Sequence, residues 1–290
     1  MHGNRFLSAY LLVGGCFLSF GNLAGASEPG DTGQKYQLAY KFKMGEVIRY
    51  AVRHTANIRS TIEGTSQDAE SKSESIKAWK VTDVLPNGEM EFIHVVESVK
   101  MSNRVPNRAE VVYDSRTDET PPVGFEQAAR AVGVPLSLIR ITPTGEIVHR
   151  EEKHPQPDSH DDVPMTLQLP AEKIAVGEKW DNTYDVPLER KSGGKTTART
   201  RRVFTLAQVA DGIATIKVDY QVLTPVSPHL ESQLVDRLTD GSVEFDLEQG
   251  RVVAQKFAAD KRVIGFAGEA SSMHYLSRLE EKLLKPGQRV

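Results

Sequence analysis

The residues Trp79–Val96, WKVTDVLPNGEMEFIHVV, form a pattern that returns at Val203–Val222, VFTLAQVADGIATIKVDYQV. In each stretch an apolar-rich run ends in a valine, a short turn contains glycine, and a longer run alternates apolar and polar residues. The pairs Asn87-Gly88 and Asp211-Gly212 supply the positive φ angles that a tight turn between strands needs. We therefore interpret this stretch as a β-hairpin at the centre of a unit that occurs twice.

Other turn signals recur in the same order along the chain. The sequence Met44-Gly45-Glu46 is echoed by Val176-Gly177-Glu178, and the turn Pro143–Gly145 is echoed by Glu248–Gly250. Turn signals that recur in the same order along a chain indicate a divergent internal duplication. Two similar curved sheets can bury their apolar faces against each other or join edge to edge. The predicted fold is mainly all-β, with long antiparallel strands in two related curved-sheet units.

One short helix is predicted near residues 123–132. Pro121-Pro122 precedes Phe125, Ala128, Ala129 and Val132, whose spacing of i, i+3, i+4 and i+7 is typical of a helix face. No counterpart of this helix occurs in the second repeat. The predicted organisation is a first unit over residues 36–150, a charged linker over 151–165 that holds prolines, and a second unit over 166–286.

Two segments give less regular patterns. Residues 64–75, GTSQDAESKSES, contain no apolar residue larger than alanine, so we expect a long solvated hairpin tip. Residues 269–285 fit a helix through Met273, Leu276 and Leu283, but their place after a predicted strand also fits a final strand. Periodicity alone does not decide between these two interpretations.

The first 26 residues have the organisation of a secretory signal peptide. Arg5 precedes the apolar run 6–20, and Ala24-Gly25-Ala26 matches an A-x-A cleavage site. The run is shorter than the roughly 20 residues that span a bilayer. A second interpretation is a lipobox that ends at Cys16, through which the mature protein would be lipid-anchored. We expect an exported protein, periplasmic or extracellular, with a disordered leader over residues 27–35 and no transmembrane segment after cleavage.

Charge and cysteine content narrow the class of protein. Cys16 is the only cysteine, so cleavage after Ala26 leaves a chain that depends on its hydrophobic core rather than on disulfides. The formal net charge is −3, which provides no basic surface for nucleic acid or for an anionic membrane. We therefore predict no nucleic-acid partner.

Several phrases of the sequence resemble a family of secreted bacterial proteins that contain a domain of unknown function. They are YKFKMGEVIRY (40–50), VVYDS (111–115) before the Pro-Pro helix, ITPTGEIV (141–148), LPAEKIAVGEKW (169–180) and VEFDLEQGRVV (243–253). The resemblance covers most of the chain from Tyr36 onward and implies an exported, duplicated, β-rich protein without functional residues to carry over. A more distant resemblance, at the level of fold, is to periplasmic lipoprotein carriers and lipid-binding half-barrels.

Three groups of residues invite a chemical interpretation. His149, His154 and His160 stand near Glu151, Glu152, Asp158, Asp161 and Asp162, a set of side chains that suits divalent metals. Their spacing matches no familiar metal site, and the prolines among them favour a hydrated linker. Asp114 and Asp246 each follow an aromatic residue at a strand end, where aspartate commonly accepts hydrogen bonds from local backbone N–H groups.

The third group is the basic cluster Lys195, Arg199, Arg201 and Arg202. Phosphate or lipid-headgroup binding is one interpretation, and a charged edge strand that resists aggregation is the simpler one. Trp79 and Trp180 are interpreted as core or sheet-face residues. The sequence has no nucleophile elbow, HExxH, P-loop or GxGxxG motif, so we predict no catalytic residue, no cofactor and no metal.

The sequence therefore favours a non-catalytic extracytoplasmic protein that binds a lipid-like or other apolar ligand between sheet faces. The alternative is a structural or protein-interaction component of the cell envelope. A metal-dependent hydrolase that uses the linker histidines is the third hypothesis. The sequence identifies neither the ligand nor the oligomeric state.

Overall fold

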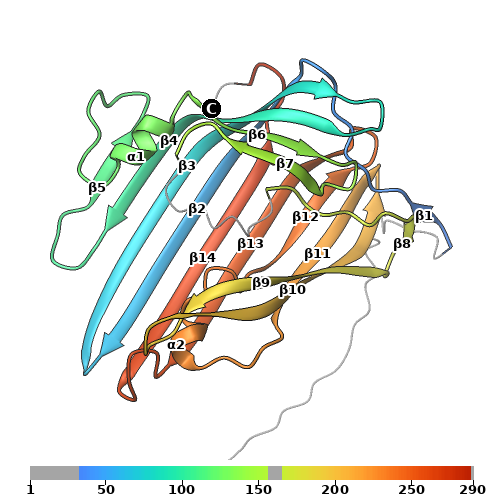
Figure 1. Ribbon diagram of the computed structural model, residues 1–290. Coiled ribbons are helices and arrows are strands. Elements are labelled where there is room, and N and C mark those ends of the chain that lie inside the picture. The colour runs from blue at the N-terminus through green and yellow to red at the C-terminus, as the bar shows by residue number, and fades with distance from the viewer. Residues whose placement is uncertain (1–32, 156–164, 289–290) are drawn as a thin grey trace, which may run out of the picture.

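The computed structural model describes residues 33–155 and 165–288, which form mainly antiparallel β-structure. A two-stranded sheet pairs β1 (Lys35–Tyr36) with β8 (Ile174–Ala175). All other strands join one 12-stranded sheet (Figure 1). Its strands are β2 (Val47–Ile62), β3 (Thr65–Val84), β4 (Met90–Arg104), β5 (Val111–Asp114), β6 (Pro135–Ile141), β7 (Ile147–Glu152), β9 (Lys179–Glu189), β10 (Lys195–Ala210), β11 (Ile213–Val222), β12 (Asp240–Asp246), β13 (Arg251–Ile264) and β14 (Ser271–Leu283).

The hairpins follow the turn signals of the sequence. The β3–β4 turn lies between the paired residues Val84 and Met90, and the β10–β11 turn lies between Ala210 and Ile213. Asp211 and Gly212 both have positive φ, at 49° and 76°, as the predicted tight turn requires. The predicted all-β class and its antiparallel hairpins are therefore confirmed.

The prediction of a solvated hairpin tip over residues 64–75 is right about the hairpin and its exposed start and wrong about its length. Residues 65–75 belong to β3, which pairs in unbroken register with β2 and also pairs with β4 from Glu70 onward. The turn is confined to Glu63 and Gly64, both with positive φ. Backbone pairing on both sides fixes this polar strand, because the ladder hydrogen bonds do not depend on apolar side chains.

Helical structure is sparse in the described residues. Helix α1 (Glu126–Ala131) lies inside the predicted range 123–132. Helix α2 (Pro228–Glu231) was not predicted, and its four residues are too few to show a helical period. Residues 271–283 form strand β14, so the structure decides the ambiguous C-terminal segment in favour of a strand.

The sheet order is β7-β6-β4-β3-β2-β14-β13-β12-β11-β10-β9, with β5 paired to β4. The final strand β14 pairs with the early strand β2 and so joins the two portions of the chain edge to edge. Figure 1 shows that the sheet is strongly curved, with its edge strands β7 and β9 on the same side of the long strands β2, β14 and β13.

The main core lies on the concave side of this sheet. Tyr50, Trp79 and Phe92 come from one wing, and Phe204 and Phe245 come from the other. Burial of each such ring contributes about 1.5–3 kcal/mol to stability. The segments Leu38–Phe42 and Met165–Ile174 add further core residues, so the interior at this end of the strands is filled. Trp79 and Trp180 take the predicted roles, since Trp79 is buried in the core and Trp180 packs against it.

Matching backbone contacts precede each repeated hairpin. Gly45 and Glu46 exchange hydrogen bonds with Val81, and Gly177 and Glu178 exchange the same pair with Leu206. These contacts support the proposal that the two portions are related units; the unit boundaries stay predictions. The predicted signal peptide (1–26), most of the predicted leader (27–35) and most of the predicted linker (151–165) lie outside the described residues. Within the described ranges, the helices are too short or too polar to cross a bilayer.

Candidate functional site: a cavity on the concave face

Beyond the filled core, the concave face of the sheet holds a cavity of about 230 Å³. Alternation along β2 places Tyr50, Val52 and His54 on this face. Leu279 on β14 pairs with His54, and Phe257 on β13 pairs with Leu279, so both lie on the same face. The lining residues are His54, Met165, Thr166, Leu167, Arg202, Phe204, Val218, Asp236, Arg237, Thr239, Gln255, Phe257, Ser277 and Leu279.

Two segments outside the sheet border this cavity. Residues 165–167 are held in place by hydrogen bonds: the Leu167 N–H donates to the Tyr40 hydroxyl at 2.9 Å, and the Thr166 hydroxyl donates to the Gly145 carbonyl at 2.6 Å. Residues 234–239 follow α2, and Leu234 and Val235 are buried in two smaller apolar clusters at the far end of the strands. The cavity therefore lies between a filled core and a second packed region.

A second cavity of about 230 Å³ adjoins the first. Its lining shares Thr166, Leu167, Arg202 and Phe204 with the first cavity and adds Gln168, Asn182, Thr183 and Tyr184. Binding sites for small molecules commonly have volumes of roughly 300–1,000 Å³, mostly apolar walls and a few polar groups. Together the two adjoining cavities fall within that range of volume, although polar side chains outnumber apolar ones in their described lining.

The walls of the first cavity combine apolar and polar groups. Phe257 of β13 and Leu279 of β14 supply partly exposed apolar surfaces, and Phe204 of β10, which is 3% exposed, adds a small area. His54 faces the same space, and burial lowers the pKa of its imidazole below the usual value, which favours the neutral form at neutral pH. Charged groups in the lining are Arg202, Arg237 and Asp236.

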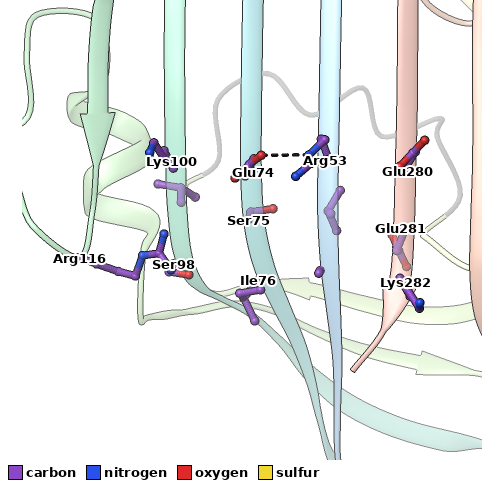
Figure 2. A pocket seen from close by; sticks show the side chains of 13 residues that line it. Arg53, Glu74, Ser75, Ile76, Ser98, Lys100, Arg116, Glu280, Glu281 and Lys282 are labelled. Carbon is purple, nitrogen blue, oxygen red and sulfur yellow. Dashed lines mark hydrogen bonds and ion pairs between the residues drawn. The ribbon is translucent and has the colours of Figure 1, made fainter. Parts of the chain in front are cut away.

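A different pocket, of about 190 Å³, lies on the convex face (Figure 2). Ala51, Ile76 and Ser98 share this face by register, and the ion pair between Arg53 Nε and Glu74 Oε1, at 2.9 Å, lies beside them. Figure 2 shows Lys100, Glu74, Arg53 and Glu280 in a row across four strands. Charges of both signs surround this pocket and it lies away from the core, so it favours no single class of ligand.

The predicted metal-ligand set is not brought together among the described residues. His149 lies on β7 and His154 follows the end of that strand, whereas Asp158, His160, Asp161 and Asp162 lie outside the described residues. In the part of the chain that the structure describes, no three His, Cys, Asp or Glu side chains are placed to hold a metal ion.

The two strand-end aspartates have the predicted local role. Asp114 Oδ1 accepts hydrogen bonds from the Arg116 side-chain Nε at 3.3 Å and from the Arg116 backbone N–H at 3.1 Å. The side-chain bond first, and then the backbone bond, holds the pKa of the Asp114 carboxyl below its usual value. Asp246 Oδ1 accepts hydrogen bonds from the N–H groups of Glu248 and Gln249. Five strands, β4, β3, β2, β14 and β13, separate β5 from β12 along the sheet, so the two carboxylates do not form a pair.

The interpretation of the basic cluster as an edge strand is wrong for Arg201 and Arg202, which lie on the part of β10 that pairs with β9 on one side and β11 on the other. Lys195 and Arg199 lie earlier on β10, where the ladder joins it to β9 alone. Alternation places Arg199 and Arg201 on the convex face and Arg202 on the concave face, where it lines both cavities. Arg202 is thus the one member of the predicted cluster that belongs to the candidate site.

Sequence reasoning did not single out His54, Phe257 or Leu279. Their alternation with core residues on the same strands could place them on the inner face, but only pairing among β2, β14 and β13 brings them side by side. Register between strands distant in sequence is not readable from periodicity.

No family model matches the chain, and no curated protein sequence matches it. Among solved structures, a structure described by "lipid-protein interactions in lipovitellin" aligns at 12% identity and a TM-score of 0.47, over 84% of this chain and 26% of that chain. The chain therefore spans about a quarter of the length of that protein.

Two further alignments are weaker. DynF from the dynemicin biosynthesis pathway of Micromonospora chersina aligns at 7% identity and a TM-score of 0.23, over 93% of this chain and 96% of that chain. A DUF1329 family protein from Desulfovibrio piger aligns at 10% identity and a TM-score of 0.15, over 83% and 87%. Likenesses at this level carry no argument about function.

Proposed function

We propose that this chain is a non-catalytic, exported protein that binds one apolar, chain-like molecule on the concave face of its sheet. The observation that carries the proposal is the open cavity between two packed regions. Phe204, Phe257 and Leu279 present their side chains to it, and the protein's own side chains do not fill it.

The energetics of such a site favour an aliphatic ligand. Transfer of each methylene from water to an apolar wall contributes roughly 0.8 kcal/mol, so a long chain accumulates affinity without specific polar contacts. A curved sheet suits this role because its inner surface touches the ligand from both wings. Met165 and Leu167 border the same space from outside the sheet and extend the apolar lining.

Binding can be measured with a fluorescent fatty acid and by native mass spectrometry after gentle purification. Ser277 is 7% exposed and lines the cavity, so Ser277→Phe should fill the space and weaken probe binding. The matched control is Ser98→Phe, which places the same ring in the convex pocket. Loss of binding in both variants would point to misfolding, and loss only in Ser98→Phe would move the ligand to the convex face.

A second candidate function is a protein-interaction component of the cell envelope. The observation that favours it is the pair of sheet edges: in the described residues, β7 and β9 each pair with only one neighbour in the large sheet. An unpaired edge can accept a strand from a partner. A strictly monomeric particle in sedimentation, with no co-purifying protein, would count against this candidate.

A further inference from the structure

Arg202 occupies a defined position between the two cavities. On the concave face of β10 it lies opposite Asn182 of β9 and Tyr220 of β11. Its side chain lines the first cavity beside Phe204 and also lines the second cavity beside Asn182. The guanidinium therefore faces the same space as the apolar walls.

The guanidinium of Arg202 makes no hydrogen bond and no ion pair with any of the described residues. Its neighbour Arg201, on the opposite face, donates from Nη2 to Gln221 Oε1 at 2.7 Å. Both arginines are half-buried, so exposure does not explain the difference. A partly desolvated cation without a partner loses hydration and gains nothing in return, unless a ligand supplies an anion.

The polar groups around Arg202 are suited to an anion. In the second cavity, the described lining contains the neutral side chains of Thr166, Gln168 and Asn182 and no acidic residue. In the first cavity Arg237 adds a second cation, and Asp236 is the one carboxylate of the described lining. The positive charge near Arg202 is therefore not cancelled within the second cavity.

We propose that the ligand is an amphipathic anion whose carboxylate or phosphate binds the Arg202 guanidinium while its aliphatic chain lies along Phe204, Phe257 and Leu279. This inference rests on the proposed function and names the class of ligand. A guanidinium suits the task because its planar set of N–H donors matches the two oxygens of a carboxylate or phosphate. The anionic group also fixes the direction of the chain within the cavity.

Calorimetric titration with oleate below its micelle concentration and with oleyl alcohol below its solubility limit tests the assignment. The variants are Arg202→Gln, Arg202→Lys and the control Arg201→Gln. We expect Arg202→Gln to weaken oleate binding roughly tenfold, the effect of one charge-assisted hydrogen bond, and to change oleyl alcohol binding less than twofold. Arg202→Lys should lose less of the oleate affinity than Arg202→Gln does, because it keeps the charge. Arg201→Gln should bind both ligands with the affinities of the wild type.

The outcomes separate this inference from the proposed function. If Arg202→Gln and Arg202→Lys bind oleate as tightly as the wild type, the headgroup assignment is overturned and the apolar site stands. If the wild type binds neither oleate nor oleyl alcohol, both proposals fail. Titration with lysophosphatidate in place of oleate compares the affinity for a phosphate headgroup with that for a carboxylate. If inorganic phosphate alone competes fully with oleate, the requirement for an aliphatic chain is overturned. Thermal unfolding of each variant checks that it is folded.

Discussion

Lys77 Nζ lies 2.7 Å from Glu281 Oε2, and the two side chains are only 17% and 6% exposed. Lys77 is on β3 and Glu281 is on β14, so the pair spans the intervening strand β2 and links the first portion of the chain to its last strand. The ammonium group also lies 5.1 Å and 5.2 Å from the ring centroids of Tyr50 and Trp79. The ion pair and the two aromatic rings therefore lie at the junction between the two portions of the chain.

Removal of one partner of this ion pair should strongly destabilise the protein. Glu281→Gln leaves a largely buried ammonium group without its counter-ion, a change that typically costs about 3–5 kcal/mol. Urea denaturation at neutral pH measures the loss. The double variant Lys77→Met, Glu281→Leu should recover most of it, because a well-packed apolar pair often replaces a buried ion pair without loss. Equal destabilisation by the single and double variants would contradict this account.

Acid should destabilise the fold partly through His94. Burial, with help from Lys77 and Arg150, lowers the pKa of His94 to about 4 from the usual 6.5. The unfolded chain therefore takes up this proton first as the pH falls. Stability that is present above pH 6.5 is lost as the pH falls toward 4, by at most about 1.4 kcal/mol per pH unit for this group.

The variant His94→Gln isolates this contribution. Urea midpoints at pH 7 and pH 4.5 should differ less in His94→Gln than in the wild type, because the variant has no proton to take up at this position. A parallel pH dependence in the two proteins would show that other groups account for the acid sensitivity.

Gly145 should tolerate no side chain. Its φ is +84°, and a Cβ at this position would lie 2.4 Å from the Leu167 carbonyl oxygen and 2.6 Å from the Tyr40 ring. Gly145→Ala must therefore displace the segment 165–167 that borders the cavity. Gly212→Ala is the matched control, with a similar φ of +76° and nothing within 4 Å.

The two variants share the backbone strain of a residue with positive φ, which costs about 1–3 kcal/mol. We expect Gly145→Ala to lower the melting temperature by clearly more than Gly212→Ala does, and to weaken binding of the fatty-acid probe as well. Equal melting temperatures would show that residues 165–167 shift without cost.

The Tyr40 hydroxyl should be worth about 1–3 kcal/mol of stability. It accepts the Leu167 N–H at 2.9 Å, and Tyr40 is 3% exposed, so Tyr40→Phe leaves a poorly hydrated N–H without an acceptor. Tyr36→Phe is the control, because the Tyr36 hydroxyl donates to Gln34 at an exposed site. Chemical denaturation should separate the variants, and a Tyr40→Phe protein as stable as the control would contradict the role assigned to this bond.

The sequence predicted the local elements well where turn chemistry and alternation agreed. Asn87-Gly88, Asp211-Gly212 and the turns at Gly145 and Gly250 all join antiparallel strands. Prediction failed where neighbours outside the segment decide the structure. Residues 65–75 are mostly polar, yet they form strand because β2, and from Glu70 onward also β4, supply partners for their backbone groups. The basic cluster was predicted to lie on an edge strand because its sequence does not reveal that β10 has neighbouring strands on both sides.

The sequence by itself determined the class of fold, the hairpins and the alternation that assigns each side chain to one of two faces, because turn preferences and the period of a strand are local properties. Only the tertiary structure decided which strands meet. The pairing of β14 with β2 brings Leu279 beside His54, and the curvature of the sheet brings Arg202 into the same cavity as Phe257. These contacts join residues separated by tens to hundreds of positions, and no local pattern in the sequence records their register.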